Sequence, residues 1–395
     1  MWPEQGLWNP CLGPLPRHLA EHELVKAAWE GIDPAKVWDC HAHLVGIGDT
    51  PSGIRLNPKL LGLQHPLEYG RREFFMNAGC AEVPGKAVDH AYVDRLMSLF
   101  AAFPAGPKVL LFAFDRAFDR KGEVDWEETD FYVPDAYARD SARKHADRFE
   151  WVASIHPYRR DCVKALEEAK RDGARAVKWL PSAMGIDPGS ELCDAFYAAI
   201  ARLDLPLISH AGLERAVAGA GVQDFGNPLK LRRALKAGVR VVVAHCASMG
   251  KDGDLDQGKN GPRVPSFELF ARMMDEPESK GRLFGDLSAV TQTHRAQIAL
   301  DRVIRSTHWH GRLLNGSDYP LPGLMPIFSP DYLAAAGFLD RAAAPVLTEI
   351  RKHNAMLFDF VAKRSLRVAG KRLPSSIFET RGFFDSVSRT VGKAP

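Results

Sequence analysis

The chain repeats one pattern along most of its length: a short β-branched or aliphatic run, then a charged segment with helical spacing. We expect eight strands, at Lys36–His43, Lys108–Phe114, Trp151–Pro157, Ala174–Pro181, Leu205–Ala211, Val239–Cys246, Arg282–Ser288 and Arg312–Asp318. Between two of them, Val163, Leu166 and Ala169 share one helix face and Gly173 supplies a stop. Such alternation is typical of strand–helix–strand units around a parallel sheet.

Eight strand–helix repeats predict an α/β fold, a (β/α)8 TIM barrel, in which catalytic groups lie at the carboxyl ends of the strands. We expect residues 36–360 to form this single catalytic domain, with an N-terminal extension at 1–35 and a C-terminal tail at 361–395. Two connections are unusually long, residues 44–84 after strand one and 249–265 after strand six. We expect these two loops to determine substrate specificity.

The amino-acid composition limits the classes of binding partner that we expect. Hydrophobic residues make up 46% of the chain, and Lys plus Arg exceed Asp plus Glu only by 52 to 49, which predicts a packed core and no nucleic-acid partner. No apolar run approaches the roughly 18 residues of a membrane helix. We therefore expect a small-molecule substrate and no membrane partner. A homo-oligomer is one option, with the aromatic segment Phe378–Phe384 as a candidate contact.

The cysteine pattern and the first residues of the chain indicate the cellular compartment in which we expect the protein. The six cysteines are scattered and form no C-x-x-C pair. The first ten residues have neither the basic start nor the apolar run of a signal peptide. These features predict a reducing, cytoplasmic location.

Histidine and aspartate side chains end several of the expected strands. His41 and His43 alternate along the first strand, so both point to the same side and can reach one ion at about 2.0 to 2.1 Å. Alone, this pair fits packed or surface histidines equally well. His210 and His245 end strands five and six, however, and Asp318 ends strand eight. Five such groups on one rim favour a metal centre.

In this order the motifs resemble the amidohydrolase superfamily, the metal-dependent TIM-barrel hydrolases, and most closely its amidohydrolase-2 branch. The resemblance spans about residues 37–358, because the Asn354–Phe358 segment also matches that branch. It implies that His41, His43, His210 and His245 are metal ligands and that Asp318 is both ligand and general base. Imidazoles with a carboxylate suit Zn, Mn, Fe or Ni, and we expect Zn.

Lys178, at the end of strand four, leaves the number of ions open. Binuclear members of the superfamily carry a lysine there that reacts with carbon dioxide to form a bridging carbamate. If Lys178 does so, His41 and His43 hold one ion, His210 and His245 hold the other, and Asp318 binds the first. Otherwise His41, His43, His210 and Asp318 hold a single ion, and His245 polarises a substrate carbonyl. We favour two ions.

Other residues are weaker candidates for the site. Arg55, Trp179 and Tyr319 are candidate substrate-binding residues, because they lie near strand ends or in the first long loop. Arg71, Arg72 and Arg263 are loop arginines that could recognise a carboxylate. Asp286 either orients a ligand histidine or caps the chain after strand seven. His156, which precedes a proline, is expected to be packed.

The resemblance implies a hydrolase in which a metal-activated hydroxide attacks an amide, ester or lactone carbonyl, with Asp318 as base and then acid. The alternative is a non-oxidative decarboxylase resembling aminocarboxymuconate semialdehyde decarboxylase. A non-catalytic binding protein on the same barrel is a third option. The intact set of ligand residues argues against it.

Overall fold

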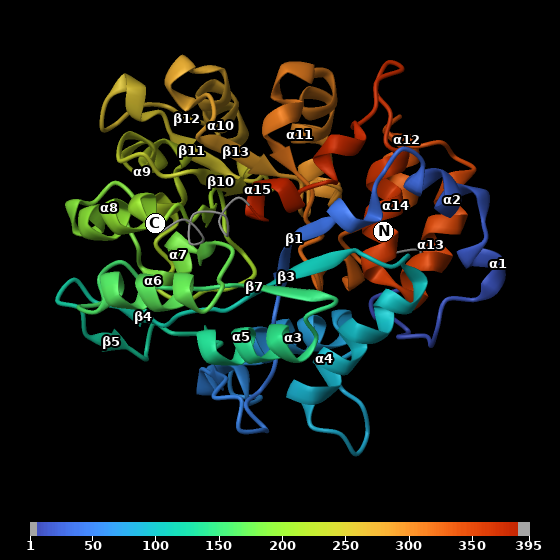
Figure 1. Ribbon diagram of the computed structural model, residues 1–395, viewed down its shortest axis with the longest axis horizontal. Helices are drawn as coiled ribbons and strands as arrows, with labels where there is room; N and C mark the ends of the chain where they lie inside the picture. Colours follow the sequence, from blue (N-terminus) through green and yellow to red (C-terminus); the bar gives the residue numbers. More distant parts are fainter. Residues whose placement is uncertain (1–5, 386–395) are drawn as a thin grey trace, which may run out of the picture.

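The computed structural model describes residues 6–385, and eight parallel strands form its centre (Figure 1). They are β1 (Trp38–His43), β3 (Lys108–Phe112), β7 (Phe149–Val152), β8 (Val177–Trp179), β9 (Leu207–His210), β10 (Val241–Ala244), β13 (Leu283–Asp286) and β14 (Leu313–Leu314). Each expected strand is present, with ends trimmed by a few residues. Sequence patterns often extend into the loops that follow a strand.

The strands close into a barrel. One sheet has the strand order β1-β3-β7 and the other has the order β14-β13-β10-β9-β8. Neighbouring strands within each sheet are parallel. Parallel bridges join the two sheets on both sides, from Ala153 to Val177 and from Ala42 to Tyr319. The predicted TIM-barrel fold is confirmed.

Helices surround the strands (Figure 1). The longer ones are α3 (Pro66–Ala78), α4 (Val88–Leu99), α5 (Asp135–Lys144), α6 (Cys162–Arg171), α8 (Asp194–Arg202), α10 (Ser266–Asp275), α11 (Thr293–Arg305), α13 (Ala343–His353) and α14 (Ala355–Ser365). The shorter ones are α1 (Arg17–Ala20), α2 (Glu23–Trp29), α7 (Pro181–Met184), α9 (Arg232–Lys236), α12 (Pro330–Ala335) and α15 (Arg381–Asp385). Within the described residues, no helix is long and apolar enough to cross a membrane.

The C-terminal segment covers the amino end of the barrel. Phe384 of α15 is fully buried and joins the cluster of side chains inside the barrel, which includes Trp38, Leu110 and Val242. The Thr380 hydroxyl donates to the carbonyl of Trp38, the first residue of β1. The proposal that Phe378–Phe384 is a surface for a subunit contact is wrong, because Phe384 fills the interior of this chain's own barrel.

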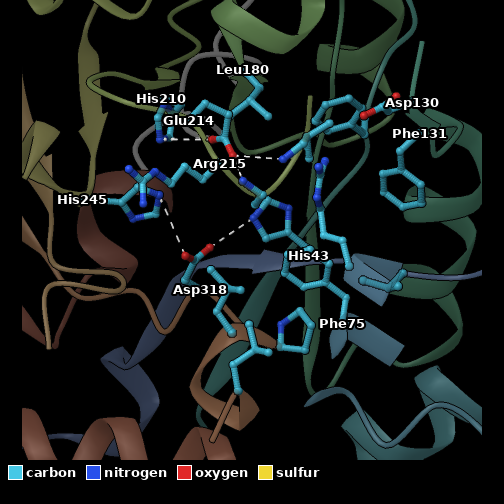
Figure 2. A pocket seen from close by; sticks show the side chains of 18 of the residues that line it. His43, Phe75, Asp130, Phe131, Leu180, His210, Glu214, Arg215, His245 and Asp318 are labelled. Atoms are coloured by element: carbon cyan, nitrogen blue, oxygen red, sulfur yellow. Dashed lines mark hydrogen bonds and ion pairs between the residues drawn. The ribbon is translucent and has the colours of Figure 1, made fainter. Parts of the chain in front are cut away.

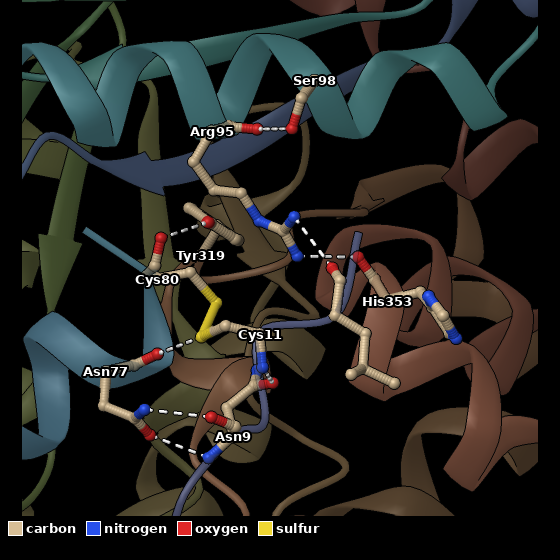
Figure 3. The surroundings of a disulfide bond; sticks show 10 residues. Asn9, Cys11, Asn77, Cys80, Arg95, Ser98, Tyr319 and His353 are labelled. Atoms are coloured by element: carbon tan, nitrogen blue, oxygen red, sulfur yellow. Dashed lines mark hydrogen bonds between the residues drawn. A yellow bond between two sulfur atoms is a disulfide. The ribbon is translucent and has the colours of Figure 1, made fainter. Parts of the chain in front are cut away.

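A disulfide ties the N-terminal segment to the barrel (Figure 3). Cys11 is bonded to Cys80, just after α3, with the two Cα atoms 5.6 Å apart. Beside it, the backbone N–H of Asn9 donates to Asn77 Oδ1 at 2.8 Å, and Asn77 Nδ2 donates to the Asn9 carbonyl at 3.0 Å. The expected cytoplasmic location stays a prediction, although disulfides such as this pair are typical of oxidising compartments. The sequence pattern missed it because the two cysteines are far apart in the chain.

Three βα connections carry small elements of their own. The loop after β1 holds β2 (Arg55–Leu56) and α3, and the loop after β3 holds β4 (Ala117–Phe118), β5 (Val124–Asp125) and β6 (Phe131–Tyr132). β2 pairs with β6, so these two loops lie together. The loop after β10 forms a separate hairpin of β11 (Lys251–Gly253) and β12 (Arg263–Pro265).

Candidate metal centre

A cavity of about 460 Å³ opens at the carboxyl ends of the strands (Figure 2). Its lining contains all of the predicted ligand residues: His41, His43, Lys178, His210, His245 and Asp318. They come from five different strands or the turns directly after them. Parallel strands of a barrel end at the same rim, which brings together residues 277 positions apart in the chain, as His41 and Asp318 are.

Asp318 lies between the two histidines of β1. Its Oδ1 is 3.1 Å from His43 Nε2 and 3.3 Å from His41 Nε2. Its Oδ2 is buried, makes no hydrogen bond within residues 6–385, and lies 3.8 Å from His245 Nε2. The carboxylate therefore has one oxygen shared with the β1 histidines and a second oxygen available to a ligand.

Asp286, at the end of β13, orients two of the histidines. Its Oδ2 is 2.9 Å from His41 Nδ1, and its Oδ1 accepts the backbone N–H of His245 at 3.0 Å. An N–H at His41 Nδ1 pointing to this carboxylate leaves Nε2 unprotonated and able to bind a metal ion. Of the two alternatives for Asp286, the contacts favour the orienting role.

The tautomer of His245 follows from its neighbours. Its Nδ1 is 3.0 Å from the carbonyl oxygen of Ser288, which can only accept a hydrogen bond, so we assign the proton to Nδ1. The neutral ring then presents an unprotonated Nε2 to the cavity. An unprotonated nitrogen binds a metal ion or accepts a proton, but it cannot donate to a substrate carbonyl.

The backbone at the rim is shaped for these side chains. His245 and Asp318 both have positive φ, at 55° and 65°, a conformation that non-glycine residues rarely adopt. Gly316 lies so close to β1 that a Cβ there would be 2.6 Å from the Cβ of His41. Only glycine permits this approach, which lets the N–H of Asp318 donate to the His41 carbonyl at 2.8 Å.

Glu214 is a member of the site that the sequence reasoning missed. Its Oε2 is 3.2 Å from His210 Nε2, and its Oε1 accepts the backbone N–H of Val217 at 3.0 Å (Figure 2). With Nε2–H directed to Glu214, Nδ1 of His210 is unprotonated, buried and without a partner within residues 6–385. The spacing of His210 and Glu214 in His-Ala-Gly-Leu-Glu was the one local signal for this pair.

Lys178 is buried beside His41. Its Nζ is 3.3 Å from His41 Nε2 and lies over the ring of Phe112. Burial lowers the pKa of the Lys178 ammonium below its usual value. A lowered pKa increases the share of neutral amine, which is the form that reacts with carbon dioxide.

Burial also sets the charge of the histidines. It lowers the pKa of His41, His210 and His245 well below the usual value, so these imidazoles are neutral near pH 7. Burial alone would raise the pKa of Asp318, but the neighbouring His41 and His43 lower it overall, so the carboxylate is ionised. Neutral imidazoles with an ionised carboxylate are the protonation states that a metal ion requires.

A divalent ion fits these residues. One nitrogen each of His41 and His43 and one oxygen of Asp318 lie within 4.8 Å of one another. A second such group consists of His41, His245 and Asp286, but Asp286 is already occupied by the ring of His41 and the backbone N–H of His245. The buried and unpartnered Asp318 Oδ2 and His210 Nδ1 are further donors that the protein itself leaves unsatisfied.

The candidate substrate-binding residues do not line the cavity. Arg55 is exposed and stacks on Trp126, and Trp179 is buried on the outer face of β8, where its indole donates to the Ile155 carbonyl. The Tyr319 hydroxyl donates to the Gly79 carbonyl, away from the cavity. Side chains alternate along a strand, so Trp179 must point away when its neighbour Lys178 points inward.

The structure also shows the positions of the three loop arginines and of His156. Arg71 and Arg72 of α3 line the cavity, whereas Arg263 lies in the β11–β12 hairpin. His156 is fully buried and its Nε2 is 2.9 Å from the Met184 carbonyl, so the expectation of a packed histidine is confirmed.

The walls of the cavity come from more loops than expected. The loop after β1 supplies apolar side chains that include Leu56, Leu60 and Phe75, as predicted for the first long loop. The second long loop contributes only Met249, so the prediction that it determines specificity is not supported. Further polar lining comes from the chain after β9 and the start of α11, with Glu214, Arg215, Gln292, His294 and Arg295, and from Asp130 directly before β6.

The chain was compared with known proteins. The family model described as Amidohydrolase matches residues 38–356. No curated protein matches the chain significantly.

Similar solved structures include an uncharacterised TIM-barrel protein from Bordetella bronchiseptica, with 16% identity, 77% of this chain and 92% of that chain covered, and a TM-score of 0.46. A second is a candidate 2-pyrone-4,6-dicarboxylic acid hydrolase from Pseudomonas putida, with 15% identity, 82% and 98% covered, and a TM-score of 0.42. A third is a 2,6-dihydroxybenzoate decarboxylase, with 14% identity, 82% and 98% covered, and a TM-score of 0.43.

Proposed function

This chain belongs to the amidohydrolase family, and on that premise we propose that it is a metal-dependent hydrolase that cleaves an amide, ester or lactone. The observation that carries the proposal is the position of Asp318. Its Oδ1 contacts both β1 histidines while its Oδ2 has no hydrogen-bond partner within residues 6–385. A carboxylate held in this way can accept a proton from a water molecule and return it to a leaving group.

The neutral histidines and Asp318 form the proposed metal centre. We propose that His41, His43 and Asp318 would hold one ion and that His210 and His245 would hold a second, with a carbamylated Lys178 as a further ligand. Zinc is the expected ion, because nitrogen ligands with a carboxylate are common in catalytic zinc sites. Such a centre supplies Lewis-acid activation of a water molecule and of the substrate oxygen.

The chain's own residues then divide the remaining work. Asp318 Oδ2 takes and returns the proton, and its ionised state is maintained by His41 and His43. Asp286 and Ser288 hold the rings of His41 and His245 so that each Nε2 remains unprotonated. The apolar wall supplied by the loop after β1 excludes bulk water from one side of the cavity.

The test compares Asp318→Asn with the wild type. Asp252→Asn is the matched control, because Asp252 is also buried, also has an unpartnered Oδ2, and lies outside the cavity. On a panel of esters and lactones, Asp318→Asn should lose about 100-fold or more in turnover and keep most of its metal. Asp252→Asn should keep both. Full turnover in Asp318→Asn would refute its role as the base.

Metal analysis tests the centre itself. Protein purified without a chelator should contain two equivalents of ion, and Lys178→Ala should lose at least one of them. A wild type with only one equivalent, which Lys178→Ala retains, would replace the two-ion arrangement by a single-ion one. No bound ion after addition of Zn or Mn would refute the metal centre. Release of carbon dioxide from aromatic carboxylates, with no hydrolysis of esters or lactones, would replace the hydrolase by a decarboxylase.

A further inference from the structure

Arg295 is a buried cation at the wall of the cavity. It lies in the first turn of α11 and is only 5% exposed. Its Nε donates to Gln292 Oε1 at 3.0 Å and its Nη1 donates to the Ser248 hydroxyl at 3.3 Å. Both partners are neutral. Within the described residues, no hydrogen bond is formed by Nη2 and no carboxylate forms an ion pair with Arg295.

The nearby carboxylates are engaged elsewhere. Asp318 is held by the β1 histidines, and Glu214 is held by His210 and by backbone N–H groups. Burial lowers the pKa of the Arg295 guanidinium, and the charges of Asp318 and Glu214 offset this only in part. The guanidinium is nevertheless charged near pH 7, because arginine starts from a very high pKa.

One other arginine is buried among the described residues, and it has several hydrogen-bond acceptors. Arg351, which is fully buried, donates to the carbonyl oxygens of Pro322, Leu324 and Phe328. A buried guanidinium that lacks such partners costs several kcal/mol. Arg295 lines the cavity, where a small molecule can supply the missing acceptor.

The other side chains that line the cavity indicate the shape and charge of a molecule that would fit it. Further cationic or basic side chains line the same cavity, among them Arg71, Arg215 and His294. Two acidic side chains, Asp130 and Glu214, also line the cavity, and their carboxylates accept backbone N–H groups of the chain after β9. Most of the remaining lining is apolar: Val45, Leu56, Leu60, Phe75, Met76, Phe114, Phe131, Leu180, Val217, Met249, Leu321, Leu324 and Ile327. A ligand that satisfies both parts has an anionic group at one end and an apolar body at the other.

We propose that Arg295 binds a carboxylate of the substrate, so that the substrate class is a carboxylic acid with an aromatic or aliphatic body. The planar guanidinium matches a carboxylate in two parallel hydrogen bonds, which lysine or a neutral donor cannot reproduce. The inference rests on the proposed function in one respect only, that the substrate occupies this cavity. Arg295 is a specificity-determining residue that contacts the substrate away from the bond that is cleaved.

The experiment measures binding of two probes of nearly equal shape, biphenyl-4-carboxylate and biphenyl-4-carboxamide, by calorimetry on the protein with its bound metal. The wild type should bind the carboxylate at least 10-fold more tightly than the amide. Arg295→Gln should lose that preference, with affinity for the amide unchanged. Arg55→Gln is the matched control, because Arg55 is an exposed arginine outside the cavity lining, and it should behave as the wild type.

Two results would overturn the inference: equal binding of both probes by the wild type, or an undiminished preference for the carboxylate in Arg295→Gln. If Arg295→Gln does not fold, Arg295→Lys takes its place. It keeps the charge but loses the paired geometry, so weaker carboxylate binding supports the inference and unchanged binding refutes it.

Metal content measured in the same samples separates the two proposals. A preference that depends on Arg295 in a protein that binds no ion would refute the metal-dependent hydrolase and leave this inference intact. If the metal-loaded protein hydrolyses esters or lactones but its preference for the carboxylate survives in Arg295→Gln, the metal-dependent hydrolase is supported and the inference about Arg295 is refuted.

Discussion

Opening the disulfide between Cys11 and Cys80 should lower the free energy of unfolding by about 4 kcal/mol. The two cysteines are 69 positions apart, so the bond closes a long loop in the unfolded chain. In the chain-entropy treatment, the stabilisation grows from about 3 kcal/mol for a 15-residue loop to about 4.7 kcal/mol for a 100-residue loop. A loop of this length lies near the upper end of that range.

The folded state should change little when the bond opens. The paired hydrogen bonds between Asn9 and Asn77 do not depend on the disulfide, and Arg95 also donates to the Leu12 carbonyl at 3.2 Å (Figure 3). These contacts keep the N-terminal segment on α3 and α4. Most of the effect therefore arises in the unfolded chain, and metal content should be unchanged.

Urea unfolding with and without dithiothreitol tests this reasoning. The reductant should lower the stability of the wild type by about 4 kcal/mol and leave the Cys11→Ser/Cys80→Ser double variant unaffected. The four free cysteines are buried in both proteins, so they serve as an internal control for other effects of the reductant. A wild type that is insensitive to dithiothreitol, or a double variant as stable as the oxidised wild type, would refute the prediction.

Three further predictions concern the site, the core and the pH dependence. Asp286→Asn should weaken metal binding about 10- to 100-fold in a chelator competition, because the carboxylate orients a ligand histidine, and unchanged affinity would contradict that role. Phe384→Ala should lower the free energy of unfolding by about 3–5 kcal/mol, whereas the exposed Leu67→Ala should change it by less than about 0.5 kcal/mol, and equal effects would refute the buried position of Phe384. Burial lowers the pKa of His156 from 6.5 to about 4. As the pH falls, His156 is therefore protonated in the unfolded chain before it is protonated in the folded chain. The stability due to this group is complete above pH 6.5 and is lost towards pH 4, by up to about 3 kcal/mol. Urea unfolding as a function of pH should therefore show a shallower loss in His156→Gln, and a parallel profile would contradict the assignment.

Much of the candidate site was predictable because its signals are local. His41 and His43 are two positions apart in a strand, His210 and His245 stand at the ends of apolar runs, and Asp318 follows another such run after three residues. In a parallel barrel, the end of a strand is also the rim of the cavity, so a position along the chain becomes a position in space.

The partners of these residues were not predictable in the same way. The sequence suggested that Asp286 could orient a ligand histidine, but nothing near it indicates that this histidine is His41 or that Asp286 also accepts the N–H of His245. Nothing near Arg295 indicates that it lacks a carboxylate partner. The substrate-binding prediction for Trp179 depended on its position near a strand end. Which face of the strand a side chain occupies also has to be known.

The sequence by itself determined the barrel and the set of residues at its rim, because strand and helix periodicity are properties of neighbouring residues. Only the tertiary structure decided that Cys11 meets Cys80, that Phe384 fills the amino end of the barrel, and that Arg295 lines the cavity without an anionic partner. Those outcomes depend on side chains brought together from distant parts of the chain. Their contact distances and burial are set by the packing of the whole molecule, which no local pattern encodes.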